Sequence, residues 1–101
     1  MKIILTEFTK SEINRLNNKY ADETSPFYDD WDGMSNEEQL ITDAGMYSEG
    51  AYVENEFDDL DTWCRAIGFS EYEQTYLNTH PNVVREKINK MLRLNLIKII
   101  K

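Results

Sequence analysis

The chain holds few of the residues from which cofactor, metal and disulfide sites are built, with one cysteine and one histidine among its 101 residues. The lone cysteine, Cys64, has no partner for an intramolecular disulfide, and together with His80 it is too small a set for a structural zinc site. The apolar run near the N-terminus, Ile3-Ile4-Leu5, is too short for a signal peptide or a membrane span. These absences predict a cytoplasmic protein with no metal, no cofactor and no membrane partner.

Enzyme motifs are also missing, because the sequence contains no glycine-rich phosphate loop, no GxSxG and no HExxH. Paired carboxylates hydrolyse glycosidic bonds, but they need a sugar-binding cleft that about 100 residues rarely build. Asp30-Trp31-Asp32-Gly33 has the alternating acids and glycine of an EF-hand loop, yet its register puts Tyr28 at the first calcium ligand and Gln39 at the last. We therefore expect neither an enzyme nor a calcium sensor.

The chain contains enough apolar side chains to form one compact core. Hydrophobic residues make up 41% of it and aromatic residues 12%, which is too much for a disordered acidic tail. A chain of 101 residues is large enough for one hydrophobic core and too small for two. We therefore expect residues 1–101 to fold as a single domain.

Helix starts are indicated by Ser or Thr three positions before Glu, the spacing of a capping box. Three such pairs occur: Thr9 with Glu12, Ser35 with Glu38, and Ser70 with Glu73. Apolar residues at helical spacing follow each pair and predict helices over 10–21, over 36–48, and through Tyr72 and Leu77, ending before His80-Pro81. A further apolar face that includes Trp63 and Cys64 predicts a helix ended by Gly68, with both side chains in the core. Asn82 is expected to cap a basic amphipathic helix over 83–93.

β-Forming residues stand at both ends of the chain. Residues 2–8 predict a short strand or the lead-in to a helix. The apolar, β-branched residues 96–101 can either pair with residues 2–5 or continue the last helix. Residues 22–34 hold a proline, a glycine and five carboxylates, which favours an aromatic-rich loop. The predicted fold class is α+β, mostly helical, with four or five short helices and a minor sheet formed by the N- and C-terminal strands.

Charge is distributed very unevenly along the chain, whose formal net charge is −8. Residues 1–21 carry a net charge of +2 and residues 63–101 a net charge of +4, whereas residues 22–62 carry fourteen acidic residues and no Lys or Arg. Such a density costs self-repulsion in the folded state, and a sequence shaped for solubility alone would normally mix both signs. The acidic stretch is therefore the strongest functional signal in the sequence.

Carboxylates on a folded surface can imitate the phosphates of nucleic acid, because side chains one helical turn apart have a spacing similar to that of phosphates along a strand. Aromatic side chains between them would either supply apolar anchors for a partner or pin the loop to the core. The residues predicted to bind a partner are Asp29, Asp30, Asp32, Glu37, Glu38, Asp58, Asp59 and Asp61 as phosphate surrogates, with Tyr28 and Trp31 as anchors. Further members of this face are expected to be Asp22, Glu23, Asp43, Glu49, Glu54 and Glu56, with Tyr47 and Tyr52.

In size, and in the acidity of residues 22–62, the chain resembles small acidic proteins with which phages and mobile elements block host nucleases, including restriction and CRISPR effectors. It also resembles bacterial immunity proteins that cap a basic nuclease toxin. These resemblances imply a non-enzymatic inhibitor of a basic nucleic-acid-binding protein or nuclease. The alternative is a general protein-protein interaction or immunity module whose acidity serves mainly solubility.

The basic residues near the C-terminus raise the question of direct nucleic-acid binding. They are Arg85, Lys87, Lys90, Arg93, Lys98 and Lys101. The acidic remainder of the molecule would oppose such binding, so we expect no direct contact with nucleic acid. These residues are expected instead to offset the acidic stretch, within the monomer or across a head-to-tail homodimer.

Overall fold

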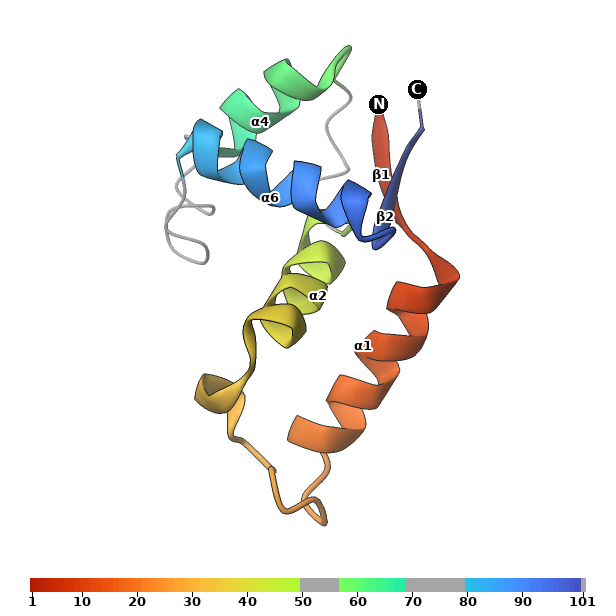
Figure 1. Ribbon diagram of the computed structural model, residues 1–101, viewed down its shortest axis with the longest axis vertical. Helices are drawn as coiled ribbons and strands as arrows, with labels where there is room; N and C mark the ends of the chain where they lie inside the picture. Colours follow the sequence, from red (N-terminus) through yellow and green to blue (C-terminus); the bar gives the residue numbers. More distant parts are fainter. Residues whose placement is uncertain (50–56, 69–79, 101) are drawn as a thin grey trace.

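The computed structural model describes residues 1–49, 57–68 and 80–100. In these ranges four α-helices and a two-stranded sheet follow one another, with a short 3₁₀ helix η1, in the order β1 (Lys2–Leu5), α1 (Glu7–Tyr20), η1 (Trp31–Gly33), α2 (Asn36–Tyr47), α4 (Leu60–Gly68), α6 (Pro81–Arg93) and β2 (Ile97–Ile100). α1 and α2 lie side by side and extend away from the sheet, whereas α4 and α6 pack together at the other end (Figure 1). The predicted α+β class is confirmed.

The two chain ends form one antiparallel sheet, which is one of the two alternatives that the sequence left open for residues 96–101. β1 pairs with β2 in a register that runs from Lys2 opposite Ile100 to Leu5 opposite Ile97. Figure 1 shows the two termini side by side as a result. Ile3 and Ile97 are both buried, so the sheet presents apolar side chains to the helices and is held there by the hydrophobic effect.

α1 begins three residues earlier than the sequence predicts, and this shortens the first strand. Thr6 is the N-cap, and its hydroxyl accepts the N–H of Thr9 at 3.3 Å. Thr9 is fully buried, and its own hydroxyl donates to the Leu96 carbonyl at 2.7 Å. The predicted Thr9–Glu12 capping box is wrong because Thr9 connects α1 to the start of β2 instead.

Of the other predicted helix starts, the start of α2 is confirmed and the start of α6 is corrected. The Ser35–Glu38 capping box is present in both directions at the start of α2. α6 begins at Pro81 with His80 as its N-cap, two residues before the predicted start, so the predicted Asn82 cap is wrong. Proline is favoured at the first helical position, where its missing N–H costs nothing. The predicted helix through Tyr72 and Leu77 lies outside the described residues.

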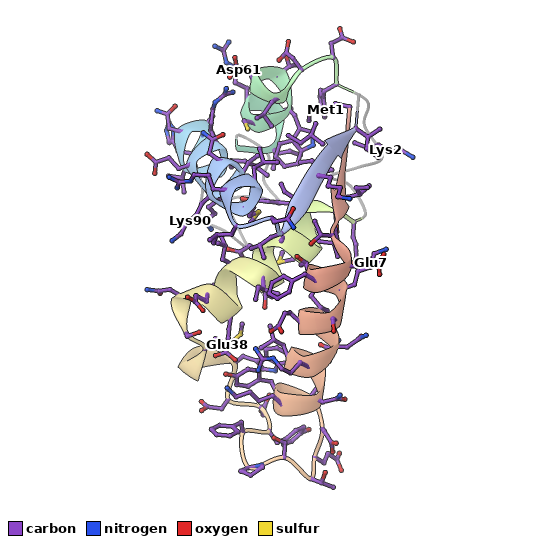
Figure 2. All side chains as sticks on the ribbon, turned by 45° about the vertical axis from the view of Figure 1, so that its right-hand side comes forward. Met1, Lys2, Glu7, Glu38, Asp61 and Lys90 are labelled. Carbon is purple, nitrogen blue, oxygen red and sulfur yellow. The ribbon has the colours of Figure 1, made fainter. Side chains whose placement is uncertain are left out.

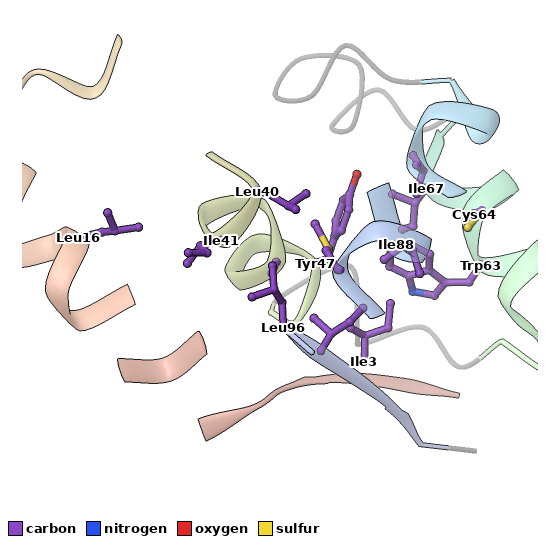
Figure 3. Packing of buried hydrophobic residues seen from close by; sticks show 14 of the residues in the cluster. Ile3, Leu16, Leu40, Ile41, Tyr47, Trp63, Cys64, Ile67, Ile88 and Leu96 are labelled. Atoms are coloured by element: carbon purple, nitrogen blue, oxygen red, sulfur yellow. The ribbon is translucent and has the colours of Figure 1, made fainter. Parts of the chain in front are cut away.

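The core lies where α4 and α6 meet α2 and the sheet (Figure 3). Trp63 is 1% exposed, and its ring meets that of Tyr47 edge to face at 5.5 Å between centroids. The predicted interface role of Tyr47 is therefore wrong, because its side chain is fully buried. Cys64 is buried beside Trp63, and this burial raises the pKa of its thiol to about 11, which keeps it protonated and unreactive at neutral pH.

Candidate functional site

The connection between α1 and α2 forms the outermost end of the molecule along its longest axis, which measures 44 Å (Figure 1). We call residues 22–33 the tip. The tip is folded by its own hydrogen bonds: the Asp29 N–H donates to the Tyr20 carbonyl at 2.8 Å, and the Asp22 carboxylate accepts from both the N–H and the hydroxyl of Thr24. The predicted loop therefore has a defined shape on the end of α1.

Two further features of the tip constrain its backbone. Asp29 has a positive φ of 61°, a left-handed conformation that Asp adopts more readily than most residues. A Cβ at Gly33 would lie 2.7 Å from Oδ2 of Asp30, so no larger residue fits there unless the Asp30 side chain moves. The shape of the tip therefore limits which residues fit at positions 29 and 33.

Three aromatic side chains are exposed at the tip. Phe27 and Tyr28 are each 48% exposed, and Trp31 is 39% exposed. The Trp31 ring also contacts the ring of Tyr20, at 5.2 Å between centroids, which holds the start of η1 against the end of α1. Exposed aromatic rings on a fixed loop are the kind of side chain that anchors protein interfaces.

The same loop carries five exposed carboxylates. These carboxylates are Asp22, Glu23, Asp29, Asp30 and Asp32. Among the described residues, no Lys or Arg lies within ion-pair distance of any of them. The Thr24 N–H lowers the pKa of Asp22, which favours its charged form further. The tip thus joins uncompensated negative charge to exposed aromatic surface.

Glu38, which the sequence places in the acidic face, is buried instead. Its carboxylate accepts hydrogen bonds from the Ser35 N–H, from Nζ of Lys19 and from the hydroxyl of Tyr20, each at 3.1 Å. The hydrogen bond from the Ser35 N–H makes the largest contribution to lowering the pKa of Glu38 to about 2, and the bonds from Lys19 and Tyr20 add to it. Burial alone would raise that pKa. Glu38 therefore belongs to the framework of the fold, and its carboxylate is not on the exposed acidic surface (Figure 2).

Lys19 is the residue at this site that sequence reasoning missed. Its ammonium group pairs with Glu38 and also lies 4.8 Å from the centre of the Phe27 ring. Lys19 thus connects the end of α1, the start of α2 and the tip between them. The available signal was a lone cation in the last turn of α1, directly before a stretch without Lys or Arg.

The low pKa of Glu38 predicts a measurable loss of stability in acid. Because the folded-state pKa lies below the ordinary value of 4.5, Glu38 stabilises the fold fully above about pH 4.5 and loses that contribution as pH falls towards about 2. Glu38→Gln should reduce the slope of unfolding free energy against pH in this window, measured by urea denaturation. Asp22 and Asp59, whose pKa values are also lowered, account for a remaining slope. Equal slopes in both proteins would contradict the assignment.

Three carboxylates that the sequence places in the same acidic face lie far from the tip. Asp58, Asp59 and Asp61 stand at the start of α4, at the opposite end of the long axis (Figures 1 and 2). Asp59 accepts the Thr62 N–H at 2.8 Å, and Asp61 pairs with Arg85 of α6. Two of these three carboxylates thus serve the helix start and its packing.

Asp43 also leaves the predicted acidic face. It is 4% exposed and pairs with Lys87 of α6 at 3.2 Å. Burial raises the pKa of Asp43, and Lys87 offsets part of that rise. Glu37 and Glu49 are exposed on and beside α2, whereas Tyr52, Glu54 and Glu56 lie outside the described residues. The described carboxylates therefore do not form one continuous face, and those of the tip gather with three exposed aromatic side chains.

Comparison of the chain with models of protein families, with curated proteins and with solved structures finds no match. Within the three described ranges, no group of three or more His, Cys, Asp and Glu side chains is placed to hold a metal ion. The helices in those ranges are all too short or too polar to cross a membrane.

Proposed function

We propose that this chain is a non-enzymatic binding protein that places its tip, together with Glu37, in the basic nucleic-acid-binding surface of a partner such as a nuclease, and so inhibits that partner. One observation carries the proposal: five exposed carboxylates without a described ion pair surround three exposed aromatic side chains on one folded loop. The carboxylates take the place of phosphates, and Tyr28 and Trp31 supply the apolar anchors.

Physical chemistry favours a basic partner for this surface. Uncompensated carboxylates on one loop repel each other in the free protein, and a cationic groove relieves this repulsion on binding. Complementary charge also raises the association rate, and salt screens that effect. The ion pair between Lys19 of α1 and Glu38 of α2 connects the two helices on either side of the tip. Little conformational freedom is therefore lost when the tip binds.

The acidic residues at the start of α4 are not part of the proposed binding surface. Asp59 and Asp61 are used in helix capping and in the pair with Arg85, so they contribute to the fold and to solubility. The proposed binding surface is accordingly smaller than the whole of residues 22–62. A general interaction module with a solubilising surface is the alternative that the experiment below must exclude.

The experiment is affinity capture from lysate with the tagged chain, washed at low and then at high salt, with mass spectrometry of the eluted proteins. We expect a nucleic-acid-binding protein that high salt releases and that added DNA or RNA displaces from the chain. Recovery of a salt-resistant partner without nucleic-acid function would contradict the proposal and favour the general interaction module. The parallel capture uses the chain with Asp30→Lys and Asp32→Lys, which should not retain the salt-sensitive partner.

A further inference from the structure

An apolar groove lies between α1, α2 and the turn that joins α6 to β2. Its volume is about 190 Å³, and it is lined by Phe8, Glu37, Leu40, Ile41, Leu94 and Leu96. Phe8 and Leu94 stand at its edges with 54% and 50% exposure, whereas Leu40, Ile41 and Leu96 form a buried floor. Covering exposed apolar side chains above an apolar floor is favourable, because it removes apolar area from water, so such a groove marks a binding surface.

Two further hollows continue the groove towards the outer face of α6. The first shares Leu40 with the groove and is also lined by Lys87 and Lys90. The second shares Lys90 and runs along α6, where it is also lined by Leu92, by Arg93 and by Glu86, whose negative charge offsets part of the positive charge there. These shared residues make the three hollows one continuous surface. We call its cationic part, Lys90 and Arg93, the basic shelf.

The basic shelf is the part of α6 whose positive charge is not already paired within the described chain. Lys87 pairs with Asp43, and Arg85 pairs with Asp61, whereas no described carboxylate lies within ion-pair distance of Lys90 or Arg93. The surface thus combines an apolar groove with adjacent cations. This is the complement of the tip, which combines exposed aromatic rings with adjacent carboxylates.

We propose that the apolar groove and the basic shelf receive the tip of a second copy of this chain. The tip and the basic shelf of one molecule lie apart, because α1 and α2 hold the tip at one end of the molecule while Lys90 lies on α6 (Figures 1 and 2). An exposed ring of the tip, such as Tyr28, enters the groove, and Asp30 and Asp32 face the shelf. Glu37, on the rim of the groove, opposes this contact by like-charge repulsion.

Self-association of this kind uses the tip that the proposed function assigns to an outside partner, so the two contacts compete. Contact through one short loop is expected to bury less area than a standard stable interface, so we expect weak association that depends on protein concentration. It would keep the acidic tip covered until a partner with a more basic surface displaces the second copy. Self-association does not depend on which outside partner the tip binds.

The test is sedimentation velocity of the full chain over a range of concentrations, at low and at high ionic strength. We expect reversible association that high salt weakens. Lys90→Glu or Leu94→Ser should weaken it by about tenfold or more, and Glu37→Gln should strengthen it. Lys2→Glu makes the same charge change as Lys90→Glu but on β1, outside the three hollows, and should leave association unchanged (Figure 2).

A mixing experiment gives the sharpest control. Lys90→Glu and the double variant Asp30→Lys with Asp32→Lys should each self-associate more weakly than the wild type, but an equal mixture should associate more strongly than either variant alone, because each variant then meets a complementary surface. A chain that stays monomeric at its highest soluble concentration would overturn the inference, as would equal effects of Lys2→Glu and Lys90→Glu. Lys90→Glu leaves the tip unchanged, so its binding to a captured partner tests the proposed function separately.

Discussion

Reversing two tip carboxylates, with Asp30→Lys and Asp32→Lys together, should weaken binding to the captured partner by about 100-fold or more at low salt. The double change replaces two attractive charges with two repulsive ones at the centre of the proposed surface. Asp29 is left unchanged because its positive φ of 61° favours Asp over Lys, and a lysine there would add backbone strain. Affinity is measured by calorimetry at low and high ionic strength, and the difference between wild type and variant should shrink as salt rises.

The matched control is Glu49→Lys with Asp58→Lys. Both side chains are exposed acids outside the tip, so the net charge changes by the same amount. This control should lose far less affinity than the tip variant. Equal losses in the two variants would show that net charge rather than the tip determines binding. Thermal unfolding of both variants should match that of the wild type, since none of the four carboxylates has a described ion pair.

Trp63→Ala should destabilise the protein by about 3–5 kcal/mol, the usual cost of removing a large aromatic side chain from a core. Trp63 is 1% exposed and meets Tyr47 edge to face between α4 and α2. Small domains have about 5–15 kcal/mol of stability in total, so this single change removes a large part of it. Urea denaturation followed by circular dichroism measures the loss.

Trp31→Ala is the internal comparison, because it removes the same side chain from the tip. Trp31 is 39% exposed and contacts Tyr20, so its removal should cost about 1 kcal/mol. The same change should clearly weaken binding to the captured partner, whereas Trp63→Ala acts through stability. A Trp31→Ala protein with unchanged affinity would remove Trp31 from the proposed anchors and leave Tyr28 in that role.

The sequence alone determined most of the secondary structure, because capping and amphipathic spacing depend on residues within one or two helical turns. The Ser35–Glu38 capping box and the apolar face through Trp63 and Ile67 are examples of such local signals. Local β-forming residues at both ends made pairing of the terminal strands possible, but they left continuation of the last helix open for residues 96–101, and the tertiary structure decided for the sheet. The start of α1 was misplaced because Thr9 bonds to Leu96, which is 87 residues away in sequence.

The tertiary structure alone decided which carboxylates remain available to a partner. No local signal distinguishes Asp43 from Asp30 and Asp32, and the capping box at Glu38 does not reveal that its carboxylate is buried. Their cationic partners, Lys19 for Glu38 and Lys87 for Asp43, lie 19 and 44 residues away. The fold also sends the tip and the start of α4 to opposite ends, although both belong to one acidic stretch (Figure 1). Charge along a chain sets how much acidity a protein carries, but burial and ion pairing depend on the elements that fold back against each residue.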